Sequence, residues 1–278
     1  MQDTFAYCAA LVRAADRDRF IASLFAPAEQ RSALHALYAF NAELARVREV
    51  AHAALPGEIR LQWWSDVVNR QRDDEAQANP VASALLATIE RYRLAPEKLI
   101  DLIEARRFDL YDDPMARIAD LEAYATKTSV NLMALAAHIL AGVEVADVVQ
   151  PAGIAYAIAG LLRAFPLHLA RRQLYVPVEL LDRHEVHLHD LFAGRSSAGL
   201  KAALADLRGL GRRHLAAARE RMTTLPPRAV PALLPVALVR PWLDRLERSD
   251  PFIPVEIPPW RRQWLMWRAA RNPARLAG

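Results

Sequence analysis

The sequence predicts an all-α fold. Apolar residues recur with the 3.6-residue period of amphipathic helices along nearly all of its 278 residues, and the strict alternation of half-buried strands is absent. Hydrophobic residues make up 53% of the chain, which is enough for a sizeable buried core. No repeat and no low-complexity linker divides the sequence, so we expect a single helical domain over residues 1–278.

Breaks in the apolar period delimit the expected helices. Proline and glycine cause most of these breaks, because proline lacks a backbone donor and both residues favour turns or helix starts. Inside one helix, Pro166 is expected to kink or end it. The helices are expected at about 28–54, 57–72, 80–93, 96–111, 118–141, 147–170, 196–223, 227–246 and 258–271.

Charge and cysteine usage limit the function classes. The net charge is +4, but the arginines are spread along the chain and mixed with acids, so no nucleic-acid partner is expected. The single cysteine, Cys8, excludes a disulfide framework and a thiolate metal cluster. We expect neither a signal peptide nor a transmembrane segment, because no sufficiently long apolar run occurs. A cytoplasmic location is therefore predicted.

Three polar clusters are candidates for metal sites. Aspartate is favoured in helix caps and turns, and the histidine spacing matches no standard zinc pattern. We therefore interpret all three as solvated caps and turns. The clusters are Asp109, Asp112 and Asp113; Asp73, Asp74 and Glu75; and His184, His187 and His189.

Several segments resemble, in order, the squalene and phytoene synthase family of prenyl-diphosphate condensing enzymes. The helix start "ALYAFN" resembles the family's "YAFCR", and "LEAYATKTS" resembles its tyrosine-bearing central helix. "GLLRAFPLHLARRQLYVP" aligns without gaps to its second catalytic helix and the "YLP" that follows. The resemblance is clear over about residues 5–192. It implies a single-domain isoprenoid synthase fold built around a central cavity.

In that family, two aspartate-rich helices hold Mg²⁺ on the substrate diphosphate, and this sequence departs from both. A cluster of Mg²⁺ ions needs carboxylates from both helices. Of the motif positions, only Glu49 is an acid, so the resemblance implies a protein with no catalytic residue, no metal and no cofactor. Thr126 and Ala42 replace a further tyrosine and arginine. The degenerate motif positions are Ala45, Arg46, Glu49, Gly160, Ala164 and His168.

A non-catalytic branch of the family, which serves in the assembly of respiratory complex I, resembles this pattern most. It shares the segments that read "FNAELARV" (40–47) and "LRAFPLHLARRQLYVP" (162–177) here. The resemblance implies a complex I subunit or assembly intermediate as partner, with an isoprenoid lipid and the inner face of the membrane as further candidates. The residues expected to bind a ligand or partner are Asn41, Glu43, Arg46, Arg163, His168, Arg171, Arg172 and Tyr175.

Two other functions stay open. The first alternative is a prenyltransferase that condenses farnesyl or geranylgeranyl diphosphate at an altered, Mg²⁺-dependent site. The second is a carrier of terpenoids without a protein partner. The C-terminal segment "PPWRRQWLMWRAARNP" also allows two interpretations. Its three tryptophans either close the helical core or lie at a lipid interface. The sequence favours the first of these, with tryptophans inward and arginines outward.

Overall fold

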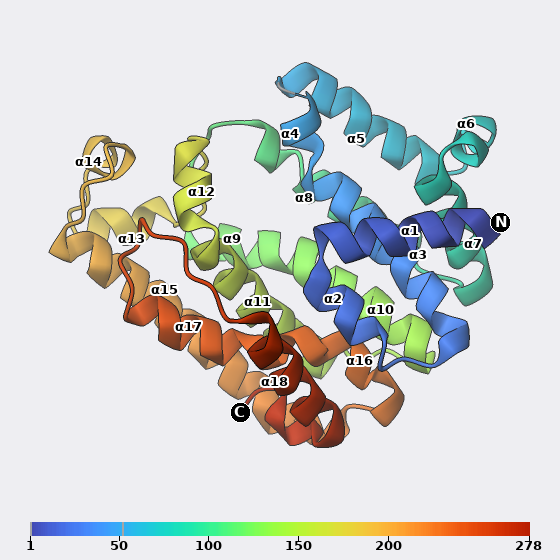
Figure 1. Ribbon diagram of the computed structural model, residues 1–278. Coiled ribbons are helices and arrows are strands. Elements are labelled where there is room, and N and C mark those ends of the chain that lie inside the picture. The colour runs from blue at the N-terminus through green and yellow to red at the C-terminus, as the bar shows by residue number, and fades with distance from the viewer. Residues whose placement is uncertain (1, 52) are drawn as a thin grey trace. The chain divides into compact units, whose positions relative to one another are not determined.

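The computed structural model describes residues 2–51 and 53–278. Helices make up 77% of the chain, and no strand occurs among the described residues (Figure 1). The residues group into two compact units. Of the described residues, unit 1 comprises 2–51, 53–111, 131–146 and 225–235, and unit 2 comprises 112–130, 147–224 and 236–278. The all-α class is confirmed, whereas the single domain over 1–278 stays a prediction.

Unit 1 is built around α3 (Ala28–Ala45). Every residue from Ala33 to Ala42 is buried, and α1, α7 and α10 pack against this helix (Figure 1). A helix that is buried on all sides belongs to a core. The other members are α1 (Gln2–Ala15), α2 (Arg17–Ser23), α4 (Val47–Ala51), α5 (Ala54–Val68), α6 (Asp73–Ala78), α7 (Pro80–Tyr92), α8 (Pro96–Ala105), η1 (Phe108–Leu110), α10 (Asn131–Ala141), η4 (Pro227–Ala229) and α16 (Val230–Leu233).

Side-chain caps set two of the helix starts in unit 1. The Asp16 carboxylate accepts a hydrogen bond of 3.1 Å from the Arg19 backbone N–H at the start of α2. The Asn79 side chain accepts from the backbone N–H groups of Val81 and Ala82, and Pro80 occupies the first helical position. Such caps satisfy backbone donors that have no partner within the helix, so they fix where it begins.

Unit 2 is organised on two long helices, α11 (Ala146–Arg163) and α15 (Ala198–Arg221). The Ser197 hydroxyl caps α15 by accepting from the Leu200 N–H at 3.0 Å, and α13 and α17 pack against α15. The other members are α9 (Ile118–Ala125), η2 (Thr126–Val130), α12 (Phe165–Ala170), α13 (Val178–Arg183), α14 (Leu188–Phe192), η3 (Met222–Thr224), α17 (Val239–Glu247), α18 (Pro259–Arg271) and η6 (Pro273–Arg275), while η5 (Leu234–Leu238) carries residues of both units.

A close approach of α11 to η2 depends on glycine. A Cβ atom added at Gly153 would lie 2.8 Å from the Cα atom of Val130, closer than real side chains come to backbone. Only glycine therefore lets the two backbones meet at this point. The contact matters for the site, because η2 and α11 carry Thr126 and Gly160.

The structure corrects several expected helix boundaries. Helices α1 and α2 precede the first expected helix and were not predicted. The segment predicted at 28–54 is divided at Arg46, the C-cap of α3, and that at 118–141 contains the π-helical turn η2. The segment predicted at 147–170 breaks at Ala164, two residues before Pro166, as expected from the missing proline donor.

Short helices are a further correction, because α6, α13 and α14 were not predicted. Their apolar pattern is too short to show a helical period. Among the described residues, no helix has the length and apolarity that a bilayer crossing requires.

Candidate functional site

The first motif lies at the end of α3 and the start of α4, in unit 1. Asn41 is buried, with 9% of its surface exposed, while Ala45, Arg46 and Glu49 are exposed. The Arg46 guanidinium lies 3.9 Å from the Glu49 carboxylate, one helical turn away. Glu49, the one acid at the expected motif positions, therefore has a cation beside it.

Two other charged side chains of this region make contacts within unit 1. The Glu43 carboxylate accepts a 2.8 Å hydrogen bond from Arg60 of α5. Arg48 donates to the backbone carbonyls of Asp109 and Tyr111, at 3.0 Å each. Both contacts join segments far apart in sequence, so they have structural roles whatever else these residues bind.

The second motif lies in unit 2, where α11 gives way to α12. The His168 ring packs against the Tyr175 ring with 4.5 Å between centroids, and Tyr124 lies 5.7 Å from Tyr175. The Gln173 amide donates to the Tyr175 hydroxyl at 3.3 Å. An aromatic cluster therefore surrounds His168, which the resemblance aligns with a metal-binding aspartate of the family's enzymes.

Two cavities of unit 2 lie near this cluster, and the larger, of about 330 Å³, shares Leu162 and Phe165 with the smaller one. The smaller cavity, of about 10 Å³, lies next to His168 and Tyr175. That is about the volume that one water molecule needs. A Cβ atom at Gly160, by contrast, would meet nothing within 4 Å. The expected cavity between the two motif helices stays a prediction.

The three arginines near the second motif divide into two groups. The Arg163 guanidinium carbon lies 5.0 Å from the centroid of the Trp242 ring, over which it sits. Arg171 and Arg172 follow α12 and are exposed, and Arg172 has a left-handed backbone with a φ of 56°. Arg163 lies on a different helix from the one that precedes Arg171 and Arg172, because the chain breaks at Ala164.

Thr126 stands where the family has a tyrosine, and it is the first residue of the π-helical turn η2. Its hydroxyl donates to the Glu122 carbonyl at 2.8 Å and accepts from the Gln150 amide at 3.1 Å. The Glu122 carboxylate lies 2.7 Å from the His214 ring nitrogen Nε2. The sequence does not reveal this network, because neither a π-turn nor contacts between distant residues have a periodic signature.

Each of the three polar clusters that were candidates for metal sites has a member engaged by a side chain outside the cluster. Among the described residues, no group of three His, Cys, Asp or Glu side chains is arranged to hold a metal ion. Asp109 pairs with Arg106 at 3.0 Å and His184 with Asp206 at 2.9 Å. The Glu75 carboxylate accepts from Arg72 and Trp63 at 2.8 Å each, and these hydrogen bonds lower its pKa.

The motif positions therefore do not fit a cluster of Mg²⁺ ions. Mg²⁺ takes hard oxygen ligands in octahedral geometry and relies on carboxylates to offset its charge. Unit 1 offers Glu49 beside Arg46, and unit 2 offers a glycine, an alanine and a histidine packed on tyrosine. These side chains supply too few oxygen ligands for the metal-dependent chemistry of the family's enzymes.

A further feature, in the C-terminal part of unit 2, was not predicted. Six arginines of α17, α18 and the segments after them line one groove of about 640 Å³ in unit 2. Its signal in the sequence is the density of arginine between residues 240 and 275, which the many arginines elsewhere in the chain obscure.

The comparisons with known proteins agree with the family resemblance that the motifs indicate. The sequence profile of the squalene/phytoene synthase family matches residues 12–268. The chain belongs to this family. A dehydrosqualene synthase solved in complex with a ligand superposes with a TM-score of 0.82 at 16% identity, over 97% of this chain and 96% of that chain. The predicted isoprenoid synthase fold is thereby confirmed.

Two relatives of similar sequence have different names, one that of an assembly factor and the other that of an enzyme. The Homo sapiens protein named NADH dehydrogenase (ubiquinone) complex I, assembly factor 6 is 30% identical over 246 residues, which cover 88% of this chain and 74% of that protein. The phytoene synthase of Thermus thermophilus is 27% identical over 208 residues, which cover 73% of this chain and 69% of that enzyme. The predicted resemblance to both branches is confirmed, while the individual site residues stay predictions.

Proposed function

We propose that this chain acts without catalysis in the assembly or maturation of respiratory complex I, the NADH:quinone oxidoreductase. The observation that carries the proposal is its similarity, along most of its length, to relatives named as complex I assembly factors. The family profile extends over both motif regions, at which the sequence is expected to depart from the enzymes of the family.

The chemistry of the motif positions supports a non-catalytic role. Ionisation of a prenyl diphosphate requires the developing negative charge of the leaving group to be neutralised, which the family achieves with Mg²⁺. Glu49 is paired with Arg46, and His168 packs on Tyr175, so neither motif supplies a set of carboxylates. We therefore propose a protein that uses no cofactor.

The partner in this proposal is a complex I subunit or an assembly intermediate. An isoprenoid lipid is a second ligand that the family's scaffold could hold, and a location in the cytoplasm, in contact with the inner face of the membrane, is a further part of the proposal. The residues proposed to contact the partner or ligand are Asn41, Glu43, Arg46, Arg163, His168, Arg171, Arg172 and Tyr175.

Two measurements on the purified full chain test the proposal against an altered prenyltransferase. The first is diphosphate release from farnesyl and geranylgeranyl diphosphate with Mg²⁺, with a phytoene synthase as the positive control. The second is affinity purification from the source organism, followed by identification of the proteins that accompany the chain. We expect no diphosphate release above background, and complex I subunits among the accompanying proteins.

Other results identify the alternatives. Robust Mg²⁺-dependent release of diphosphate would establish a prenyltransferase and overturn the proposal. A terpenoid extracted with the protein, without any complex I subunit, would establish a carrier. Mass spectrometry of the extracted lipids distinguishes this carrier from an assembly factor that also holds an isoprenoid.

A further inference from the structure

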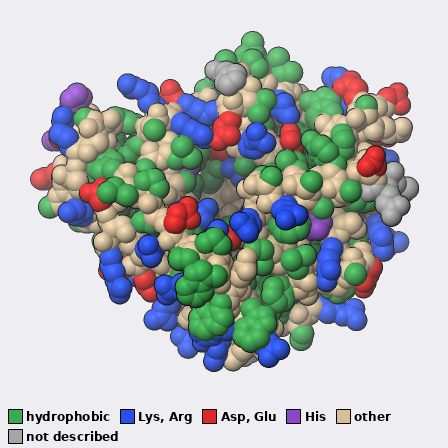
Figure 2. Space-filling model, in the orientation of Figure 1, with side chains coloured by type: hydrophobic (Ala, Val, Ile, Leu, Met, Phe, Trp, Pro, Cys, Tyr) green, Lys and Arg blue, Asp and Glu red, His purple; other side chains and the backbone are tan. Residues whose placement is uncertain are grey.

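The C-terminal helix α18 exposes three tryptophans. Trp260 is 68% exposed, Trp264 is 46% exposed and Trp267 is 44% exposed, whereas Met266 and Ala269 are buried. The sequence favoured the reverse orientation, with tryptophans inward, and this interpretation is wrong. Figure 2 shows apolar side chains gathered on the surface where α18 lies in Figure 1, with basic side chains around them.

Helix geometry places these rings on one side of α18. Residues at i, i+4 and i+7 lie within about 60° of one another around a helix of 3.6 residues per turn. The Arg268 guanidinium carbon lies 4.3 Å from the Trp264 ring centroid, and that of Arg271 lies 4.5 Å from the Trp267 centroid. Cation–π contacts therefore hold positive charge directly over the exposed rings.

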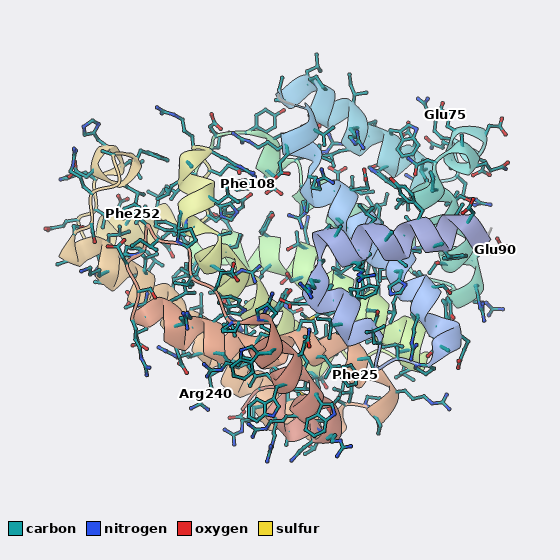
Figure 3. All side chains as sticks on the ribbon, in the orientation of Figure 1. Phe25, Glu75, Glu90, Phe108, Arg240 and Phe252 are labelled. Atoms are coloured by element: carbon teal, nitrogen blue, oxygen red, sulfur yellow. The ribbon has the colours of Figure 1, made fainter. Side chains whose placement is uncertain are left out.

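An arginine-rich groove adjoins this side of α18. The groove has a volume of about 640 Å³, and Leu265 and Ile257 give it apolar walls. Arg240, labelled in Figure 3, contributes from the first turn of α17. The arginines that line the groove are Arg240, Arg245, Arg248, Arg261, Arg268 and Arg275.

The groove carries an excess of positive charge. Asp244 is the one acid among its lining residues, and it is engaged by Arg212 at 3.1 Å and by Arg240 at 3.9 Å. Arg245, Arg248 and Arg261 are exposed, and the ion pairs of Asp244 and Glu247 in the described part of the chain are made by Arg212 and Arg240. These three guanidinium groups are therefore available to an external anion.

The two features are adjacent on the same helix. Arg261, Leu265 and Arg268 face the groove, about 100° around the helix from the tryptophan side. Arginine forks bind phosphate oxygens, often through two parallel hydrogen bonds. Tryptophan is enriched where an apolar phase meets water, because its ring is apolar and its N–H is polar.

We propose that α18 and the adjoining groove form a docking surface for an anionic phospholipid bilayer. The three tryptophans enter the interface between headgroups and acyl chains, and the groove arginines bind headgroup phosphates. A helix with this division of residues lies in the plane of the interface and does not span the bilayer. The proposal deepens the membrane contact proposed above, rests on residues of unit 2 alone, and does not depend on the role in complex I.

Sedimentation of the purified full chain with lipid vesicles tests the proposal. Vesicles of phosphatidylcholine are compared with vesicles of phosphatidylcholine and phosphatidylglycerol. We expect binding to the anionic vesicles and little to the zwitterionic ones. Because each basic residue near an anionic surface adds roughly fivefold to the affinity, Arg245→Gln, Arg248→Gln and Arg261→Gln together should weaken binding about a hundredfold.

A matched control removes the same net charge elsewhere. Arg13, Arg17 and Arg213 are exposed arginines outside the groove, and the combined variant Arg13→Gln, Arg17→Gln and Arg213→Gln should bind anionic vesicles nearly as well as the unmodified chain. Equal loss in the two triple variants would show that only net charge matters, and would overturn the proposal.

The tryptophans are tested in the same assay. Replacing Trp260, Trp264 and Trp267 by glutamine should abolish vesicle binding and the blue shift of tryptophan fluorescence on adding anionic vesicles, with an unchanged circular dichroism spectrum. The last measurement is a titration of the purified chain with inorganic diphosphate. Tight binding of free diphosphate without vesicle binding would show a site for a soluble anion and overturn the membrane proposal. The assay contains no complex I, so its failure leaves the proposed role in assembly to be judged by its own tests.

Discussion

The guanidinium of Arg163 lies over the Trp242 ring, 5.0 Å from its centroid. Arg163 is the last residue of α11, and Trp242 is a buried residue of α17 with 4% of its surface exposed. The contact therefore joins the helix of the second motif to the C-terminal part of unit 2. An arginine that the family resemblance placed among partner-binding residues has a structural contact of its own.

Replacing Arg163 should therefore lower stability. Arg163→Ala removes a half-buried cation–π contact, which contributes roughly 1 kcal/mol at partly desolvated sites. Urea unfolding should show a lower free energy of unfolding by about that amount. Arg172→Ala is the matched control, because Arg172 is exposed after α12, and it should change the midpoint little. A midpoint unaffected by Arg163→Ala would show that the contact contributes nothing.

Two glycines of the same helix should respond in opposite directions to alanine. At Gly160 an added Cβ atom meets nothing within 4 Å, so Gly160→Ala should stabilise the protein by about 0.5–1 kcal/mol through helix propensity. At Gly153 the Cβ atom would lie 2.8 Å from the Val130 backbone, so Gly153→Ala should cost about 1–3 kcal/mol. Thermal unfolding of the two variants provides the measurement, and shifts of the same sign would contradict the described packing of α11.

Stability should fall in mild acid through His35. This ring lies 2.8 Å from the Ser23 hydroxyl and stacks on Phe20, and burial, followed by the charge of Arg31, lowers its pKa from 6.5. The unfolded chain therefore binds a proton more readily than the folded one. The contribution of neutral His35 is complete above pH 6.5 and is lost as the pH falls below it towards the folded pKa.

The variant His35→Gln tests this dependence. Its free energy of unfolding should fall less steeply between pH 7 and pH 5 than that of the unmodified chain. An identical slope in both proteins would assign the acid sensitivity to other groups. The measurement is a series of urea denaturation curves at fixed ionic strength, which keeps the screening of surface charges constant.

The sequence allowed the fold class and most long helices to be predicted, because their signals are local. The start of α7 follows from Asn79-Pro80, and the break at Ala164 follows from Pro166. The family could be predicted from ordered motifs on α3 and α11. Helices α1 and α2 were missed, although Asp16 is a good cap, because the apolar period before residue 24 is interrupted by charged residues.

The sequence predicts a set of site positions, which stay predictions, and it did not reveal the contacts that these residues make. Ion pairs such as Glu43 with Arg60 and ring contacts such as His168 with Tyr175 depend on how segments meet in space, which helical spacing does not reveal. The orientation of α18 was mispredicted for a related reason. Tryptophan is buried on average, so an apolar stripe is normally assigned to the core, and only the packing of Met266 and Ala269 identifies the inward side.

The most direct test of the central proposal is NADH:quinone oxidoreductase activity in membranes from a strain that lacks the gene, measured beside its carotenoid and hopanoid content. We expect the activity to be largely lost, to return when the intact gene is supplied, and to be accompanied by unchanged carotenoid and hopanoid levels. Full oxidoreductase activity together with the loss of a carotenoid or hopanoid would contradict the proposal, and would show that the chain is an enzyme of isoprenoid synthesis.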